Sequence, residues 1–114
     1  MSTKRSRLTE EEVLLSALMG ELTCRQLSAV RVTDADGRAA LDVLDCGFRP
    51  RRVFVELSFH WFYWGDRSDE RVSCQQIPYA AARIAEASQA GWYEGEQGDL
   101  RSRIDKIVRA YRIQ

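Results

Sequence analysis

The sequence predicts an α+β domain with an N-terminal helix, an antiparallel β-sheet built from hairpins, and two C-terminal helices packed on the sheet. Thr9 and Glu12 form a Thr-x-x-Glu capping box, which is typical of a helix start. Side chains along residues 53–64 alternate between two faces, which indicates a strand. Pro78 and Asp99 each precede a helical pattern, alanine-rich after the first and amphipathic after the second.

Length and composition indicate one globular domain. The chain has 114 residues, of which 45% are hydrophobic and 30% charged, as in ordinary folded proteins. Residues 1–7 are polar and basic, so we expect a flexible arm there and a single α+β domain over residues 8–114. Lys and Arg number 17 and Asp and Glu also 17, so the whole molecule exerts no long-range attraction on nucleic acid.

Cysteine usage and hydropathy point to a reducing compartment. Cys24, Cys46 and Cys74 are odd in number and form no CxxC pair, so we expect reduced, mostly buried thiols and no metal site or other cofactor. The basic start runs into three glutamates instead of an apolar stretch, and no run is long enough to span a membrane. We therefore expect a small soluble protein in the cytoplasm.

The first helix is expected to bury one face and to end early. Gly20 predicts that the helix weakens or ends near it. Thr23 and Gln26 predict a second capping box, which would open a short helix through Leu27. The side chains expected on the buried face recur at spacings of three and four, namely Val13, Leu14, Ala17, Leu18 and Leu22.

Residues 30–46 are compatible with two structures that imply different functions. In the first, residues 30–33 and 38–44 are strands joined by a turn at residues 34–37, with Gly37 at the position that needs positive φ. In the second, Asp34 or Asp36 caps a helix that carries the apolar residues of the 39–44 segment inward.

The second structure resembles a winged helix-turn-helix domain over residues 8–64. The first helix, residues 22–27, the Ala-Leu-x-x-Leu pattern at residues 40–44, Gly47 and the basic residues 49–52 fall where such domains place their helices and wing. This resemblance implies a DNA-binding transcriptional regulator, with DNA contacts from Arg38, Arg49, Arg51 and Arg52. However, DNA phosphates would repel the carboxylates of the would-be recognition segment, and this favours the hairpin. These carboxylates are Asp34, Asp36, Asp42 and Asp45.

The strand at residues 53–64 ends in an aromatic cluster. Trp61, Phe62, Tyr63 and Trp64 include residues from both faces of one strand, so we expect part of the cluster to be exposed. Exposed aromatic side chains often dominate protein interfaces, and these four residues are candidate partner-binding residues. A polar connection at residues 65–69 and a partner strand within residues 70–76 are expected to follow.

The C-terminal part is expected to form two helices. An alanine-rich helix over residues 79–90 stops at Gly91, and residues 92–98 form an exposed loop. The last helix then carries a basic outer face, which adds Arg101, Arg109 and Arg112 to the candidate partner-binding residues.

No motif for catalysis is present. His60 is the only histidine, and Cys74 would need it as a base across the hairpin to become a nucleophile. A phosphate loop, a nucleophile elbow and a spaced metal-ligand cluster are all missing, so we expect no enzyme activity and no catalytic residue.

We therefore expect a non-enzymatic protein-binding module that acts as a small inhibitor or adaptor of a macromolecular machine. In size, neutrality and lack of catalytic motifs the chain is similar to small phage-encoded inhibitors such as anti-CRISPR proteins. The expected partner is another protein, such as part of a nucleic-acid-processing complex, and direct DNA binding is less favoured. An unpaired edge strand or an exposed aromatic face can also be covered by a second copy, so a homodimer is a further expectation.

Overall fold

The computed structural model describes residues 9–65, 67–92 and 109–110. These residues form an α+β fold with two α-helices and one five-stranded antiparallel sheet. The helices are α1 (Glu10–Cys24) and α2 (Ile77–Ala90), and a short 3₁₀ helix, η2 (Ser68–Glu70), precedes the last strand. The strands are β1 (Ala29–Thr33), β2 (Ala39–Leu44), β3 (Pro50–Glu56), β4 (Trp61–Tyr63) and β5 (Arg71–Ser73).

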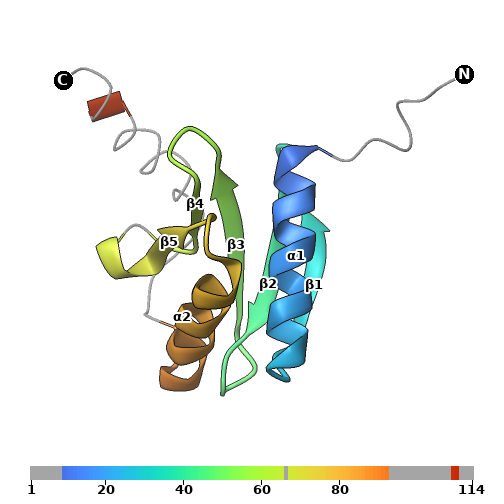
Figure 1. Ribbon diagram of the computed structural model, residues 1–114. Helices are drawn as coiled ribbons and strands as arrows, with labels where there is room; N and C mark the ends of the chain where they lie inside the picture. Colours follow the sequence, from blue (N-terminus) through green and yellow to red (C-terminus); the bar gives the residue numbers. More distant parts are fainter. Residues whose placement is uncertain (1–8, 66, 93–108, 111–114) are drawn as a thin grey trace, which may run out of the picture.

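The sheet is a simple meander in which each strand pairs with its neighbours in sequence, in the order β1-β2-β3-β4-β5. Figure 1 shows α1 and α2 side by side in front of the sheet. The main core lies between these helices and the sheet, where Leu18 and Ile84 meet Val53, Phe62 and other fully buried side chains. A smaller cluster of Ala40, Phe54 and Tyr63 belongs to the opposite face. Because every strand pairs with its neighbour in sequence, the connecting turns lie at the ends of the sheet.

The capping box of α1 is confirmed, but the predicted end of the helix is wrong. Thr9 accepts from the backbone N–H of Glu12 at 3.1 Å, and the Glu12 carboxylate accepts from the Thr9 backbone N–H at 2.9 Å. Gly20 does not end the helix, because a single glycine costs only about 1 kcal/mol in a helix whose other side chains pack. The helix runs to Cys24, and no second helix opens before Leu27.

The buried face of α1 is rotated from the predicted one. Leu18 and Leu22 are buried as expected, and Leu15 completes their face. Val13 is 52% exposed and Ala17 is also exposed. The spacing of Leu15, Leu18 and Leu22 places three leucines on one side of the helix. Their apolar area is larger than that of Val13 and Ala17, so the leucine side is the buried one.

The hairpin at residues 30–44 is confirmed, and the alternative helix over residues 39–44 is wrong. Strands β1 and β2 pair in antiparallel register from Ala29 opposite Val43 to Thr33 opposite Ala39. Gly37 has φ +84° in the turn, as the sequence predicts. The helix that the winged helix-turn-helix resemblance requires is therefore not formed, since its residues are a turn and a strand.

The single strand predicted at residues 53–64 is wrong, because residues 57–60 turn the chain back on itself. His60 takes φ +55° in this turn, and Val55 pairs with Phe62 across the hairpin of β3 and β4. The turn shifts the alternation by one, so Phe62 and Trp64 share the helix-covered face with Val55. The polar connection and the next strand, β5, are where the sequence predicts them.

The first of the two predicted C-terminal helices is confirmed as α2. Pro78 lies in its first turn, and Gly91 ends it with φ +94°. Trp92 is 5% exposed, so its predicted place in an exposed loop is wrong. The predicted last helix lies almost entirely outside the described residues; Arg109 and Ala110 are helical and exposed.

Candidate functional site

Three of the four aromatic residues predicted to bind a partner are core residues. Phe62, Tyr63 and Trp64 are 0%, 0% and 1% exposed, so they cannot contact a partner in this structure. The hairpin explains this correction, because α1 and α2 cover one face of β4 and Tyr63 packs on Phe54 at a ring separation of 5.6 Å on the other. Trp61 is partly exposed, with the Arg71 guanidinium 4.6 Å from its ring centre.

The arginines predicted to contact partners have different outcomes. Arg101 and Arg112 lie outside the described residues, whereas Arg109 is exposed. Three of the four arginines assigned to DNA in the winged helix-turn-helix interpretation make hydrogen bonds within the fold instead, and one of these is Arg49. Arg38 donates to the Tyr63 hydroxyl at 3.1 Å and to the Val55 carbonyl at 2.8 Å, and Arg52 donates to Asp42 at 3.0 Å.

His60 and Cys74 are neighbours, but their arrangement does not activate the thiol. The Cys74 backbone N–H donates to the His60 carbonyl at 2.7 Å. Burial raises the pKa of the Cys74 thiol to about 12, so the nucleophilic thiolate is disfavoured. His60 is exposed. Contrary to the expectation of mostly buried thiols, Cys24 and Cys46 are exposed, and all three cysteines are free.

The described part of the chain contains no cluster of three or more His, Cys, Asp or Glu side chains placed to hold a metal ion. Within that same part, neither helix has the length and apolar character needed to cross a membrane.

Two turns of the sheet have the same hydrogen-bond pattern but carry different residues at the position of positive φ. In the first, Asp34 N–H donates to the Arg38 carbonyl at 2.9 Å, and Gly37 N–H donates to the Asp34 carbonyl at 3.0 Å. In the second, Asp45 N–H donates to the Arg49 carbonyl at 3.0 Å, and Phe48 N–H donates to the Asp45 carbonyl at 2.9 Å. The side chain of each leading aspartate also accepts from two backbone N–H groups inside its turn.

Phe48 therefore stands where the matching turn has glycine. Gly37 has φ +84° and Phe48 has φ +62°, the left-handed region that only glycine adopts without strain. A bulky residue there costs about 1–3 kcal/mol. The Phe48 side chain recovers little of this by burial, since the residue is 80% exposed. The turn would form at lower cost with glycine, so folding does not explain the aromatic ring.

A buried carboxylate holds this turn rigidly against the end of α2. The Asp45 side chain is 1% exposed and accepts from the backbone N–H groups of Gly47, Arg49 and Trp92, and from the Arg49 guanidinium, at 2.8–3.1 Å. Burial alone would raise the pKa of Asp45, but these hydrogen bonds outweigh it and lower the pKa to about 2. The Cys46 N–H also donates to the Ser88 carbonyl at 3.0 Å. Phe48 is thus presented by a fixed loop.

A small hollow of about 210 Å³ adjoins Phe48. Gln26, which also has a positive φ (+66°), lines the hollow, so two of the strained residues meet there. Asp45 is the one charged residue among the described lining residues, and its carboxylate is satisfied inside the turn. The described lining consists of Gln26, Leu27, Ser28, Leu44, Asp45, Cys46, Phe48, Ser88 and Gln89. We call Phe48 and this lining the Phe48 surface.

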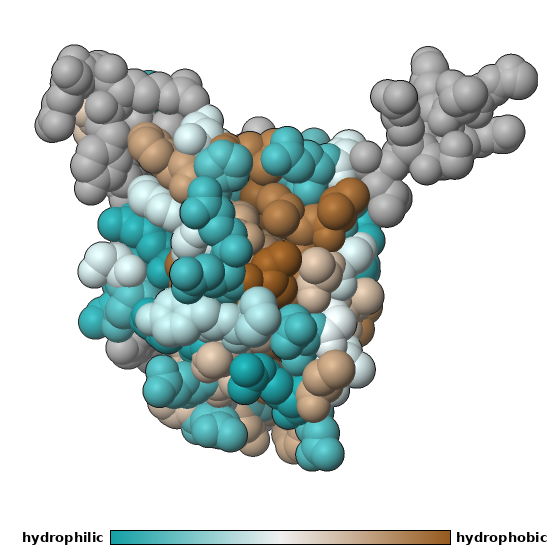
Figure 2. Space-filling model, viewed as in Figure 1, coloured by the Kyte–Doolittle hydropathy of each residue, from teal (hydrophilic) through white to brown (hydrophobic). Residues whose placement is uncertain are grey.

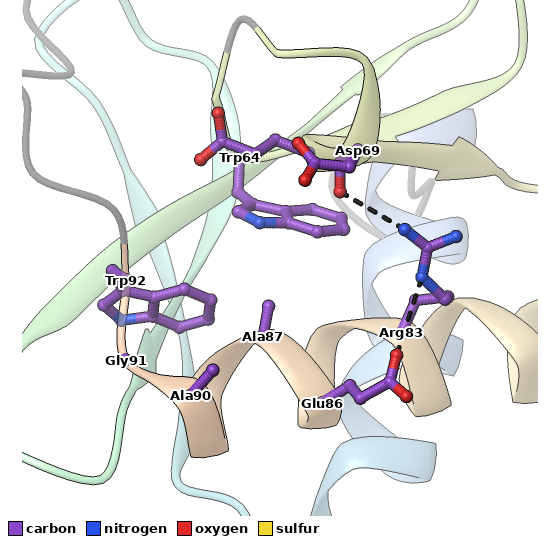
Figure 3. A pocket seen from close by; sticks show the side chains of 9 residues that line it. Trp64, Asp69, Arg83, Glu86, Ala87, Ala90, Gly91 and Trp92 are labelled. Atoms are coloured by element: carbon purple, nitrogen blue, oxygen red, sulfur yellow. Dashed lines mark hydrogen bonds and ion pairs between the residues drawn. The ribbon is translucent and has the colours of Figure 1, made fainter.

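A larger pocket of about 420 Å³ lies between α2 and η2 (Figure 3). In this view the Trp64 indole lies above the pocket and the Trp92 indole at its left, and Ala87 and Ala90 form its floor on α2. Its described charged lining residues are Asp69, Glu70, Arg83 and Glu86.

Apolar side chains also reach the surface on the helix side of the molecule. Figure 2 shows a hydrophobic patch beside the upper part of α1. Val13, on α1, is one of the exposed large hydrophobic residues, together with Val30, Phe48 and Tyr79. Of these four, Phe48 is the most exposed and the only one with positive φ.

No protein-family model, no curated protein and no solved structure matches the chain.

Sequence reasoning missed Phe48, although a signal for it is present. The segments Asp-Ala-Asp-Gly-Arg at residues 34–38 and Asp-Cys-Gly-Phe-Arg at residues 45–49 share their first and last residues. Comparing them as two copies of one turn would have identified Phe48 as the residue in the glycine position.

Proposed function

We propose that the protein is a protein-binding module whose anchor is Phe48. The observation that carries this proposal is the phenyl ring in a left-handed turn position, exposed to 80%, where the matching turn has glycine. Strained backbone and exposed aromatic side chains on rigid loops are concentrated at binding sites. Interfaces are enriched in aromatic residues because such rings bury a large area with few rotatable bonds.

The energetics favour a partner that covers the ring. Full burial of an aromatic side chain gains roughly 1.5–3 kcal/mol, which is comparable with the cost of holding Phe48 at positive φ. The loop is already fixed by the Asp45 carboxylate and by the Cys46–Ser88 backbone hydrogen bond, so a partner spends little free energy on ordering it. Burial of the ring in the complex thus offsets the backbone strain at Phe48, which the free protein carries without compensation.

The chemistry of the Phe48 surface specifies an apolar contact from the partner. The hollow of about 210 Å³ is too small for most small-molecule ligands but suits one side chain. Its described lining presents Leu27, Leu44 and polar uncharged groups, so a neutral apolar side chain fits better than a charged one. We propose that the protein uses this contact to act as a small inhibitor or adaptor. Its proposed partner belongs to a nucleic-acid-processing complex.

Affinity capture from the native cell, with mass spectrometry, tests the proposal. The bait proteins are wild type, Phe48→Gly and Phe48→Ala, with Val13→Ala and Tyr79→Ala as controls. The controls remove an exposed apolar residue and an exposed aromatic residue, 52% and 51% exposed, from other surfaces. We expect wild type and both controls to capture a protein that neither Phe48 variant captures.

The captured protein must then bind purified wild type directly. Capture of the same proteins by Phe48→Gly and wild type would contradict the proposal. A complex of the wild type with duplex DNA at low salt, lost steeply at higher salt, would instead support the regulator alternative. Light scattering on the purified protein tests the homodimer by measuring the molar mass.

A further inference from the structure

We infer that the pocket between α2 and η2 binds a basic side chain with an apolar stem, such as arginine or lysine in a peptide. The pocket measures about 420 Å³, within the range of specific ligand sites and twice the volume of the hollow beside Phe48. Phe48 is not among its described lining residues, and the inference does not depend on the proposed function of that residue.

The top, one side and the floor of the pocket suit an apolar stem. Trp64 and Trp92 line the top and one side, and Ala87 and Ala90 supply methyl groups along the floor (Figure 3). The Trp92 indole N–H is not available to a ligand, because it donates to the Arg49 carbonyl at 2.8 Å. This bond, together with the Trp92 backbone N–H bond to Asp45 at 3.1 Å, fixes the tryptophan in place. The apolar part of the pocket is therefore preformed.

The rim of the pocket carries more acidic than basic side chains among its described lining residues. Arg83 is the one cation among the described lining residues, and its guanidinium is already engaged. It donates to the Tyr79 hydroxyl at 3.3 Å and to the Asp69 carbonyl at 3.4 Å, and lies 3.9 Å from the Glu86 carboxylate. Figure 3 shows this guanidinium at one side of the opening, between Asp69 and Glu86.

The carboxylates determine the charge of the ligand. Asp69, Glu70 and Glu86 line the pocket against Arg83, and Glu86 is the most accessible of its ion-paired carboxylates, with a side chain 79% exposed. An anionic ligand would meet this excess of negative charge, whereas an ammonium or guanidinium group is attracted by it and brings donors to the exposed Glu86 carboxylate. A lysine or arginine stem can lie on the alanines while its charged end reaches the rim.

An NMR titration tests this inference on the isolated protein. The probes are the peptides acetyl-Gly-Arg-Gly-amide, acetyl-Gly-Lys-Gly-amide and the first with citrulline, which is uncharged, in place of arginine. The readout is the chemical shift of the Trp92 indole N–H and of the Ala87 and Ala90 amides in ¹⁵N-labelled protein. We expect saturable shifts with both cationic peptides and weaker binding of the citrulline peptide.

The Glu86→Gln variant removes one rim charge without touching the core. Since an exposed ion pair contributes about 0.2–1 kcal/mol, we expect this variant to raise the Kd of the arginine peptide about 1.4- to 5-fold. Glu11→Gln, the same change on α1, should leave the Kd unchanged, and so should Phe48→Gly. Equal affinity for the citrulline and arginine peptides, or no saturable shift at Trp92 and the two alanines, would overturn the inference. Neither result would affect the proposal for Phe48.

Discussion

The Asp45 carboxylate accepts a hydrogen bond from the backbone N–H of Trp92 at 3.1 Å, across 47 residues of sequence. Trp92 returns a bond from its indole N–H to the Arg49 carbonyl at 2.8 Å, and the Arg49 guanidinium donates to the Trp92 carbonyl at 3.0 Å. These three bonds fasten the β2–β3 turn to the end of α2. The exposed Phe48 and the wall of the larger pocket are therefore supported by the same contacts.

Asp45→Asn should lower the stability of the protein and loosen the β2–β3 turn. An asparagine amide turned toward the backbone N–H groups of Gly47, Arg49 or Trp92 places donor against donor, and the remaining oxygen carries no charge. We expect a lower urea midpoint and faster amide exchange at Gly47 and Arg49. Glu86→Gln, which changes a side chain 79% exposed, is the control and should unfold like wild type.

The same carboxylate should contribute to acid unfolding. Its pKa is lowered from 3.8 to about 2 in the folded protein, so its contribution to stability is full above pH 3.8 and is lost as the pH falls toward 2. Wild type should therefore lose stability over this range, and Asp45→Asn should lose less. Urea unfolding at several pH values measures the difference. A difference between wild type and Asp45→Asn that stays constant from pH 5 to pH 2 would contradict this assignment.

The two exposed thiols should react and the buried one should not. Cys24 and Cys46 are exposed, whereas Cys74 is 4% exposed and its pKa is raised to about 12 by burial. At pH 8 a coloured disulfide reagent should label Cys24 and Cys46 rapidly in the native protein, with Cys74 joining only in denaturant. Rapid labelling of Cys74 in the native protein, identified by peptide mapping, would show that the core around β5 is more open than described.

Glycine at position 48 should not harm the fold. Phe48→Gly removes the left-handed strain of about 1–3 kcal/mol but adds about 0.5–1 kcal/mol of unfolded-state entropy. We therefore expect a free energy of unfolding at least equal to that of wild type. Phe48→Ala keeps the strain and loses the ring, so it should be less stable than Phe48→Gly by about 1 kcal/mol. Urea unfolding of the three proteins measures these differences in stability. A marked loss of stability in Phe48→Gly would mean that the ring has a structural role.

Three local signals in the sequence predicted local structure correctly, whereas Gly20 and the Thr23–Gln26 pattern did not. The Thr9–Glu12 capping box, the Asp34–Gly37 turn and the end of α2 at Gly91 each depend on residues close in sequence, and each is confirmed. These features follow from backbone hydrogen bonding and from the freedom of glycine at positive φ. They were sufficient for the α+β class and for the antiparallel hairpins.

The aromatic cluster was misjudged because one turn lacks the usual signals. Residues 57–60 contain no Gly, Pro, Asn or Asp, and His60 supplies the positive φ of +55°. Without a visible turn, residues 53–64 read as one strand, which assigned Phe62 and Trp64 to the wrong face. Trp92 could not be placed either, because its burial depends on its contacts with Asp45 and Arg49, far away in sequence.

The most direct test of the role of Phe48 is the affinity of the captured partner for purified wild type and Phe48→Gly, measured by isothermal titration calorimetry. An anchor residue contributes about 2 kcal/mol or more to binding, so we predict a Kd at least roughly 30-fold higher for Phe48→Gly, with folding stability retained. The same Kd for both proteins would contradict the account, because the strained aromatic ring would then take no part in recognition.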